Sequence, residues 1–394
     1  MLFGAMKFKR GGFSMHFGKI LCIVLSAHLL FGVGISVQAR EDISVDAKAV
    51  VVMEASTGRV LYSQNAYTRM PIASTTKIMT ALLALEHPSL HAQFEADAGA
   101  IRVEGSSMGL RAGDRVTLYS LAQGMLLASG NDAANAAAVR MAGSIPAFSQ
   151  MMNAKAREIG MYNTSFVTPS GLDADGHYST AFDMALLTRH ALRNSNFAEI
   201  CSQYRMRSHY GNPPYDRWLV NHNKLLNYYE YAIGVKTGFT RAAGRCLVSA
   251  ARWDGITLII VTLTCPDDWN THERLYELFF PTLELRDISD GLSLPQIPVT
   301  GGTQPYVNTM KFSLPMFPVP AEGVLIEYNI FAPAFLYAPL RSGQSVGHVE
   351  IVVDGKTLAT LSIISACDVP LLHPYREQRG FFESIGYFFT GLLY

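Results

Sequence analysis

Apolar residues recur with two different periods along the chain, and these periods predict a protein that contains both helices and strands. They recur at helical spacing over residues 74–87, and Pro88 ends that stretch. Residues 116–144 are rich in Ala, Leu and Met, which predicts helices with a break at Ser129-Gly130-Asn131. Three later segments predict consecutive strands, and the last is apolar enough to be buried on both faces: residues 232–240, 246–253 and 256–263.

Further elements flank this region. Residues 49–62 predict a hairpin around Thr57-Gly58, and a helix should begin near Thr180, with Thr180 and Asp183 as a capping box. Another helix is predicted over residues 270–280. Gly, Pro, Ser and Thr then gather near residues 287–305, and short apolar runs separated by turn residues follow. This change predicts a separate small all-β domain over residues 296–369, without a cluster of chemically active side chains.

The first 39 residues predict a secretory signal peptide. Four basic residues and no acidic one precede an almost wholly apolar stretch, residues 20–37, and Val37-Gln38-Ala39 has the small-x-small pattern of a cleavage site. A retained membrane anchor is the alternative. Export places the mature chain in a periplasm or cell-wall space, with 28 basic and 32 acidic side chains after cleavage.

The last segment, residues 370–394, has a different pattern. Its apolar positions recur at helical spacing and are mostly aromatic: Phe381, Phe382, Ile385, Phe388, Phe389, Leu392 and Leu393. A helix of about 15 residues is too short to span a bilayer. We therefore expect an amphipathic helix that attaches the protein to the outer face of the cytoplasmic membrane. A terminal helix packed on the protein itself is the alternative.

Composition narrows the function classes. The 394 residues are 49% apolar and 16% charged, which excludes a wholly disordered chain. Basic and acidic residues number 32 each, so no basic surface for nucleic acid is predicted. The sequence contains no CxxC pair, HExxH, GxGxxG or Walker loop, so no metal or cofactor is expected. Four cysteines follow the signal segment. Either Cys246 and Cys265 form a disulfide on neighbouring strands, or all four are buried free thiols.

Three short motifs occur in a set order: Ser74-Thr75-Thr76-Lys77, Ser129-Gly130-Asn131 and Lys236-Thr237-Gly238. Each alone has a simpler explanation: a helix-capping serine with a solvated lysine, a turn, and an ordinary strand. Their combination in an exported chain is far more specific, since this set is typical of serine acylating enzymes.

The chemistry explains these residue types. Ser74 and Lys77 are three residues apart near a helix start, so their side chains share one face. A serine needs a base to become a nucleophile, and a lysine acts as one only when burial and a second cation, such as Lys236, lower its pKa. Ser129 can relay a proton and Asn131 can hold both a lysine and a carbonyl.

The third motif suits substrate binding. Gly238 has no side chain, so a substrate backbone can lie along this strand, while Lys236 and Thr237 can hold a carboxylate.

The chain resembles the serine D-alanyl-D-alanine carboxypeptidases of low molecular mass, the S11 group of penicillin-binding proteins. Besides the three motifs, the resemblance includes Pro71-Ile72-Ala73, Leu126-Leu127-Ala128, Pro169-Ser170-Gly171-Leu172-Asp173, Gly176-His177-Tyr178-Ser179-Thr180-Ala181 and residues 234–244. One departure is Thr168-Pro169-Ser170-Gly171, where the family commonly has Asn-Pro-His-Gly.

The resemblance implies an α+β fold of the β-lactamase/transpeptidase type, an antiparallel sheet flanked by helices, over residues 40–286. It implies that Ser74 is acylated, Lys77 is its general base, and Ser129 and Asn131 shape the site and pass protons. Lys236 and Thr237 would bind the terminal carboxylate beside Gly238, and the backbone N–H groups of Ser74 and Phe239 would bind the oxyanion. The implied substrates are peptidoglycan stem peptides ending in D-Ala-D-Ala, with β-lactams as covalent inhibitors.

Three alternatives use the same residues. A D,D-transpeptidase differs only in the acceptor of the acyl group. A β-lactamase would need a further deacylating glutamate, and no acid between Asn131 and Lys236 sits in an E-x-x-L-N setting. A catalytically idle penicillin-binding module would be expected to lack one of Ser74, Lys77 or Lys236, and all three are present.

Overall fold

The computed structural model describes residues 43–372, apart from residues 289–291, 311–315 and 354. The predicted signal segment, residues 1–39, lies outside the described residues, and so does the predicted tail beyond Leu372. Among the described residues, no helix is both long and apolar enough to cross a bilayer.

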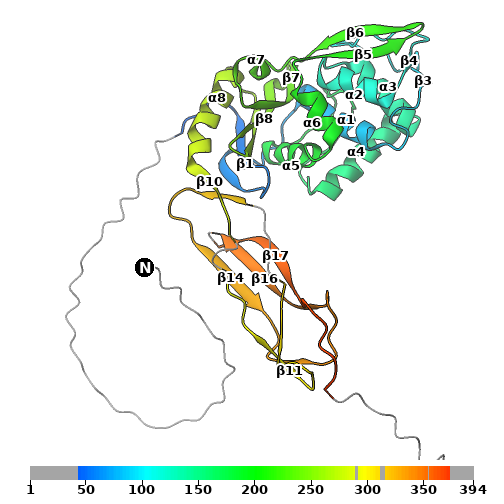
Figure 1. Ribbon diagram of the computed structural model, residues 1–394. Coiled ribbons are helices and arrows are strands. Elements are labelled where there is room, and N and C mark those ends of the chain that lie inside the picture. Colours follow the sequence, from blue (N-terminus) through cyan, green and yellow to red (C-terminus); the bar gives the residue numbers. More distant parts are fainter. Residues whose placement is uncertain (1–42, 289–291, 311–315, 354, 373–394) are drawn as a thin grey trace, which may run out of the picture. The chain divides into compact units, whose positions relative to one another are not determined.

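A five-stranded antiparallel sheet organises residues 45–282 (Figure 1). Its order is β2–β1–β9–β8–β7, which leaves β7 at one edge. The strands are β1 (Ala49–Glu54), β2 (Val60–Gln64), β7 (Ala232–Thr240), β8 (Gly244–Trp253) and β9 (Ile256–Leu263). The predicted hairpin and the three consecutive strands are therefore confirmed, and all but one residue of β9 is buried.

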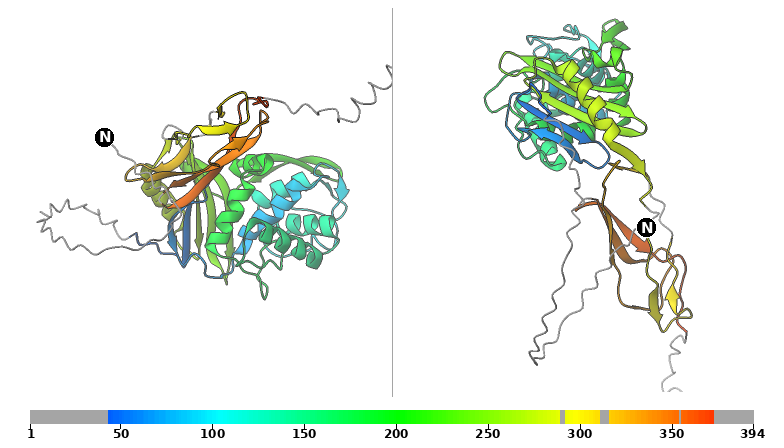
Figure 2. Two further views of the ribbon diagram at one scale, coloured as in Figure 1. Left: turned by 90° about the horizontal axis from the view of Figure 1, so that it is seen from below. Right: turned by 90° about the vertical axis from the view of Figure 1, so that its left-hand side faces the viewer.

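Side chains along these strands alternate between two layers of helices. Val248 and Val261 belong to the large hydrophobic cluster that also contains residues of α5 (Ala181–Ala191). On the opposite face, Ser249 and Thr262 hydrogen bond to His272 of α8 (Asp268–Phe279). Figure 2 shows α8, coloured yellow-green, on the side of the sheet opposite to the cyan and teal helices of residues 77–159, so the predicted α+β architecture is confirmed.

The other helices are η1 (Ala73–Thr76), α1 (Lys77–Glu86), α2 (Leu118–Leu126), α3 (Asn131–Ala142), α4 (Ile145–Ile159), α6 (Ser195–Ser202) and α7 (Leu225–Tyr228), with η2 (Phe280–Thr282) following α8. Of these helices, α1 and α4 pack on α5, while α7 packs on β7. The predicted break between α2 and α3 is present. At the start of α5 the Thr180 side chain accepts a hydrogen bond from the Asp183 N–H, which is one half of the predicted capping box. The Asp183 carboxylate accepts instead from the Asn163 N–H and the Thr164 hydroxyl.

The sequence patterns missed a second sheet of order β3–β4–β5–β6. Its strands are β3 (Phe94–Glu95), β4 (Arg115–Val116), β5 (Arg205–Gly211) and β6 (Pro214–Val220). Side chains of the β5–β6 hairpin alternate between a buried and an exposed face, but the buried face includes Ser208 and the exposed face includes Trp218, so apolar residues do not mark the alternation in the sequence.

The described residues between 283 and 372 form strands and no helix, and we call them the strand-only part. The strands are β10 (Leu283–Arg286), β11 (Ile297–Thr300), β12 (Tyr306–Val307), β13 (Phe317–Pro320), β14 (Ile326–Phe331), β15 (Leu336–Tyr337), β16 (Ser345–Val353) and β17 (Lys356–Ile364). Two three-stranded sheets, β12–β11–β15 and β14–β16–β17, share a hydrophobic cluster distinct from that of the helical part. β10 pairs with β13.

The four described cysteines are all free thiols, so the disulfide alternative is wrong. Cys201, Cys246 and Cys265 are buried, whereas Cys367 is half-buried rather than buried as the second alternative had it. Burial raises the pKa of Cys201 to about 12 and that of Cys246 to about 11, which keeps both thiols protonated and unreactive.

Candidate active site

Ser74 lies in a tight turn immediately before α1. The turn, η1, begins at Ala73, whose φ of 47° is in the left-handed region. Thr75 anchors it by donating from Oγ1 to the carbonyl of Ile72 at 2.6 Å. The loop that contains Gly171 packs directly against this turn, because a Cβ at Gly171 would lie 1.9 Å from the carbonyl oxygen of Ala73. The backbone that carries Ser74 is thus held from two sides.

Lys77 is fully buried, and its ammonium group has three partners. Nζ lies 2.8 Å from Ser74 Oγ, 2.7 Å from Asn131 Oδ1 and 2.6 Å from the carbonyl oxygen of Ser170. Burial, and then the charge of Lys236, hold the pKa of Lys77 well below its usual value, while Asp132 acts in the opposite direction. A neutral amine has two N–H groups and one lone pair. The two carbonyl oxygens accept the two N–H groups, which leaves the lone pair for the Ser74 hydroxyl.

Ser129 and Asn131 reach the site from the break between α2 and α3. Ser129 has a φ of 57° and its side chain lines the same cavity as Ser74. Asn131 donates from Nδ2 to the carbonyl of Glu104 at 2.6 Å, so its amide oxygen faces Lys77. Asp132 accepts from three consecutive backbone N–H groups of residues 108–110 and thereby fixes the loop across the cavity.

The third motif lies on the edge strand β7, next to the nucleophile turn. Gly238 faces that turn, because a Cβ there would lie 3.0 Å from the carbonyl oxygen of Ile72 and 3.1 Å from the nitrogen of Ser74. Lys236 is buried and donates to the carbonyl of Thr237 at 2.9 Å. Burial lowers its pKa to about 7. Phe239 is 66% exposed, at the mouth of the site.

These residues surround one cavity of about 350 Å³. Five of the eight predicted residues line it: Ser74, Ser129, Thr237, Gly238 and Phe239. The other three, Lys77, Asn131 and Lys236, lie behind its wall as buried groups. The structure thus brings all eight together. The cavity also has lining residues that the sequence patterns did not identify: Ser106, His222, Lys224, Arg245, Asp268 and Trp269.

Arg245 is the most informative of the missed residues. It lies on β8 directly opposite Phe239 of β7. Its Nη2 is 2.5 Å from Oδ1 of the buried Asp268, and its guanidinium lies 5.6 Å from the ring centroid of Trp269. Pairing the predicted strands 232–240 and 246–253 as a hairpin would have placed residue 245 beside the third motif.

His272 has no access to the cavity. It is fully buried between Ser249 and Thr262, at 2.6 and 2.9 Å, and burial lowers its pKa to about 3. His272 therefore joins α8 to the sheet and remains neutral.

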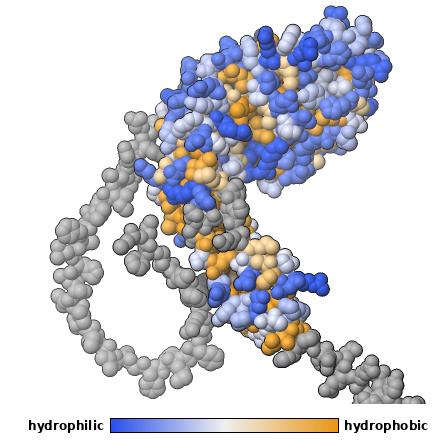
Figure 3. Space-filling view, in the orientation of Figure 1, coloured by the Kyte–Doolittle hydropathy of each residue, from blue (hydrophilic) through white to orange (hydrophobic). Residues whose placement is uncertain are grey.

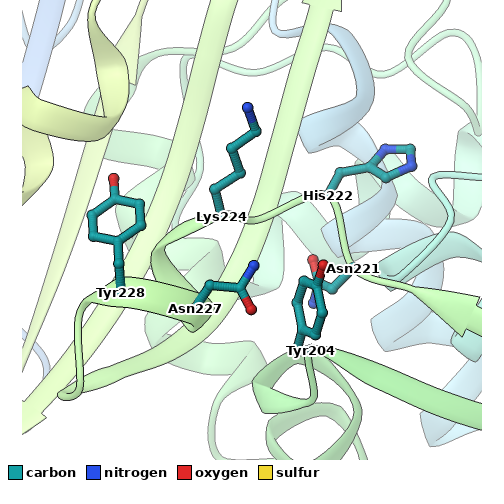
Figure 4. A pocket seen from close by; sticks show the side chains of 6 residues that line it. All are labelled: Tyr204, Asn221, His222, Lys224, Asn227 and Tyr228. Carbon is teal, nitrogen blue, oxygen red and sulfur yellow. The ribbon is translucent and has the colours of Figure 1, made fainter.

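A second cavity, of about 460 Å³, adjoins the first and shares His222 and Lys224 with it. Figure 4 shows both side chains rising from one loop, with the amide of Asn227 directed toward the ring of Tyr204. Burial, and then the charges of Lys236 and Lys77, lower the pKa of His222. Within the described part of the chain, no group of three His, Cys, Asp or Glu side chains forms a potential metal site.

This fold and this arrangement define a serine peptidase of the penicillin-binding protein type. Residues 36–267 match the peptidase S11 family, described as D-alanyl-D-alanine carboxypeptidase, and the chain belongs to that family. It is 30% identical to D-alanyl-D-alanine carboxypeptidase DacF of Bacillus subtilis, over 89% of this chain and 94% of that protein. It is 32% identical to DacC of Escherichia coli, over 88% of each chain.

A solved structure supports the fold over most of the chain. Penicillin-binding protein 5 from Haemophilus influenzae superimposes with a TM-score of 0.68 at 28% identity, covering 83% of this chain and 98% of that one.

Proposed function

We propose that the chain removes the terminal D-Ala from peptidoglycan stem peptides ending in D-Ala-D-Ala, through an acyl-enzyme on Ser74. The observation that carries this proposal is the environment of Lys77. Its Nζ is 2.8 Å from Ser74 Oγ, and its other two partners are hydrogen-bond acceptors only. With a lowered pKa, Lys77 can accept the serine proton at neutral pH.

The proposed reaction has two halves. Ser74 Oγ transfers its proton to Lys77 and attacks the carbonyl carbon of the penultimate D-Ala, while the backbone N–H groups of Ser74 and Phe239 hold the oxyanion. The peptide C–N bond then breaks, and the leaving amine receives a proton through the Ser129 hydroxyl. Water attacks the resulting ester and returns Ser74 to its free form. A β-lactam follows the first half, since its ring amide opens on the same serine.

The substrate carboxylate has three candidate partners. Two of them, Thr237 and the buried cation of Lys236, lie on β7 and would bind the substrate carboxylate from that side. We add Arg245 to them, because Asp268 takes only the Nε and Nη2 side of its guanidinium and the side chain remains 42% exposed beside the cavity. Arg245 then recognises the free C-terminus that distinguishes a carboxypeptidase substrate.

Intact-mass analysis after brief exposure to penicillin tests the nucleophile. The mature chain, residues 40–394, should gain one penicilloyl group, and Ser74→Ala should gain none. Ser63→Ala is the matched control, because Ser63 is an exposed serine on β2, away from the cavity. An adduct on Ser74→Ala, or none on the wild type, would contradict the proposal. Rapid loss of the adduct would favour a β-lactamase, and transfer of the acyl group to an added amine would favour a transpeptidase.

We also propose that residues 1–39 direct export, that residues 40–286 and 296–369 are separate domains, and that residues 370–394 attach the protein to the outer face of the cytoplasmic membrane. The separate hydrophobic clusters support the division into domains. The aromatic positions at helical spacing support attachment through the tail. Flotation with lipid vesicles tests the attachment: residues 40–394 should float, and a chain ending at Leu372 should bind much more weakly.

A further inference from the structure

Five large apolar side chains are exposed near the point where the described chain stops. They are Tyr306 (44% exposed), Phe335 (47%), Tyr337 (69%), Leu371 (36%) and Leu372 (57%), and we call them the apolar end. Figure 3 shows hydrophobic residues gathered at this end of the strand-only part. Soluble proteins rarely expose such a group without a partner for it.

The sheet β12–β11–β15 brings these side chains together. Its central strand β11 buries Ile297 and Val299 and exposes the alternate positions. Tyr306 pairs with the exposed position on one side, Pro298, and Tyr337 pairs with the exposed Thr300 on the other. The two tyrosines therefore lie on the outer face of one small sheet.

The other members adjoin the same strand end. The ring centroids of Phe335 and Tyr337 are 5.3 Å apart. The N–H of Leu372 donates to the carbonyl of Gly301 at 2.9 Å, immediately after β11, which places the last described residues beside the tyrosines.

The segments that form this end are uncharged. No Asp, Glu, Lys or Arg occurs in residues 291–310 or 328–340. Charged residues border these segments in the sequence at Asp290, Lys311, Glu327 and Arg341. Asp368 precedes Leu371, and its carboxylate accepts a hydrogen bond from the Ser342 N–H. An uncharged surface rich in Tyr, Phe and Leu suits the boundary between lipid headgroups and acyl chains.

We propose that the apolar end is a membrane-contacting surface, which inserts Phe335, Tyr337 and Leu372 into the same bilayer that holds the tail. This inference rests on the proposed attachment through residues 370–394. Eight residues, 373–380, separate Leu372 from the first apolar pair of the tail pattern. Fully extended, they span about 28 Å. A tail bound at the interface therefore keeps the apolar end within reach of the bilayer at high effective concentration.

A tryptophan at position 337 tests the contact directly. Full mature chains, residues 40–394, carrying Tyr337→Trp or the control Tyr215→Trp are mixed with vesicles of equal parts phosphatidylcholine and phosphatidylglycerol. Tyr215 is 50% exposed on β6, far along the sequence from the apolar end. The expected result is a blue shift of emission, with quenching by brominated lipid, for the 337 variant only. Binding of the chain without a shift at 337 would overturn the inference while leaving attachment through the tail intact.

Vesicle affinity supplies a second measurement. Replacing two half-exposed aromatic rings, Phe335→Ser with Tyr337→Ser, should weaken partitioning about 10-fold or more. The matched control, Tyr215→Ser with Trp218→Ser, removes two equally exposed rings from β6 and should leave partitioning unchanged. Equal affinity of both double variants would contradict the proposal.

Two other occupants of the surface would give different results. If the tail itself covers the apolar end, ending the chain at Leu372 changes the emission of Trp at 337 without any lipid. If a second copy of the chain covers it, the wild type is a dimer in lipid-free solution and the double variant is a monomer. Either result would overturn the assignment to the membrane.

Discussion

Replacing Arg245 by Gln should reduce activity only toward substrates with a free C-terminal carboxylate. The Arg245 side chain is 42% exposed and already paired with Asp268, so the substrate meets one edge of a guanidinium that is held in place. A hydrogen bond to a charged group contributes roughly 1.5–3 kcal/mol, which corresponds to about 10- to 150-fold in kcat/KM. Partial exposure favours the lower end of this range, about 10-fold.

The assay compares release of D-Ala from an acylated D-Ala-D-Ala peptide with release of D-alaninamide from the matching C-terminal amide. For Arg245→Gln, kcat/KM should fall about 10-fold with the free-carboxylate substrate and change little with the amide substrate. Arg252→Gln is the matched control, since Arg252 is an exposed arginine on the same strand and its side chain hydrogen bonds to Thr257. Equal loss on both substrates would refute the reasoning, because it would show that Arg245 supports the site's structure rather than recognising the carboxylate.

Three further predictions follow from the buried lysines and the glycine contacts. The pH profile of kcat/KM should fall at low pH as Lys77 becomes protonated, and at high pH as Lys236, with a pKa of about 7, loses its charge. Lys236→Arg should move the alkaline limb upward, since a guanidinium stays charged. An unchanged limb would contradict this assignment. Because the pKa of Lys236 is lower in the folded than in the unfolded chain, the unfolded chain binds more protons between pH 7 and the usual lysine pKa of 10.5. Stability should therefore rise with pH across that window, and Lys236→Met should raise Tm at pH 7 by about 2–4 °C for each kcal/mol recovered. A lowered Tm would show that the hydrogen bond of Lys236 stabilises the fold by more than burial of its amine costs. Gly171→Ala should abolish acylation and destabilise the fold strongly, because its Cβ would lie 1.9 Å from the Ala73 carbonyl oxygen. Gly113→Ala has a similar positive φ with no atom within 4 Å, so urea unfolding should show only a cost of about 1–2 kcal/mol for it. Similar losses of unfolding free energy for the two variants would mean that the backbone of residue 171 does not pack tightly against the Ala73 carbonyl.

Local rules predicted much of the fold and most of the candidate site. The strands β7, β8 and β9 were predicted because their apolar runs are bounded by turn residues. The pairing of Ser74 with Lys77 was predicted because residues three apart near a helix start share a face. The β5–β6 hairpin was missed because its buried face includes the polar Ser208 and its exposed face includes Trp218, so apolar residues do not follow the strand period. Arg245 was missed because its relevance depends on pairing with β7 and on an acid in α8.

The amino-acid sequence by itself determined which reactive groups the chain carries, the order of its three motifs, and the short-range spacing that joins a serine to a lysine. Only the tertiary structure decided that this lysine is a base. Its partners Asn131 and Ser170 lie 54 and 93 residues away along the chain, and its burial arises from packing among α1, α3 and the loop before α5. A pKa depends on solvent exclusion and on neighbouring charges, and both result from contacts between residues that are distant in the sequence.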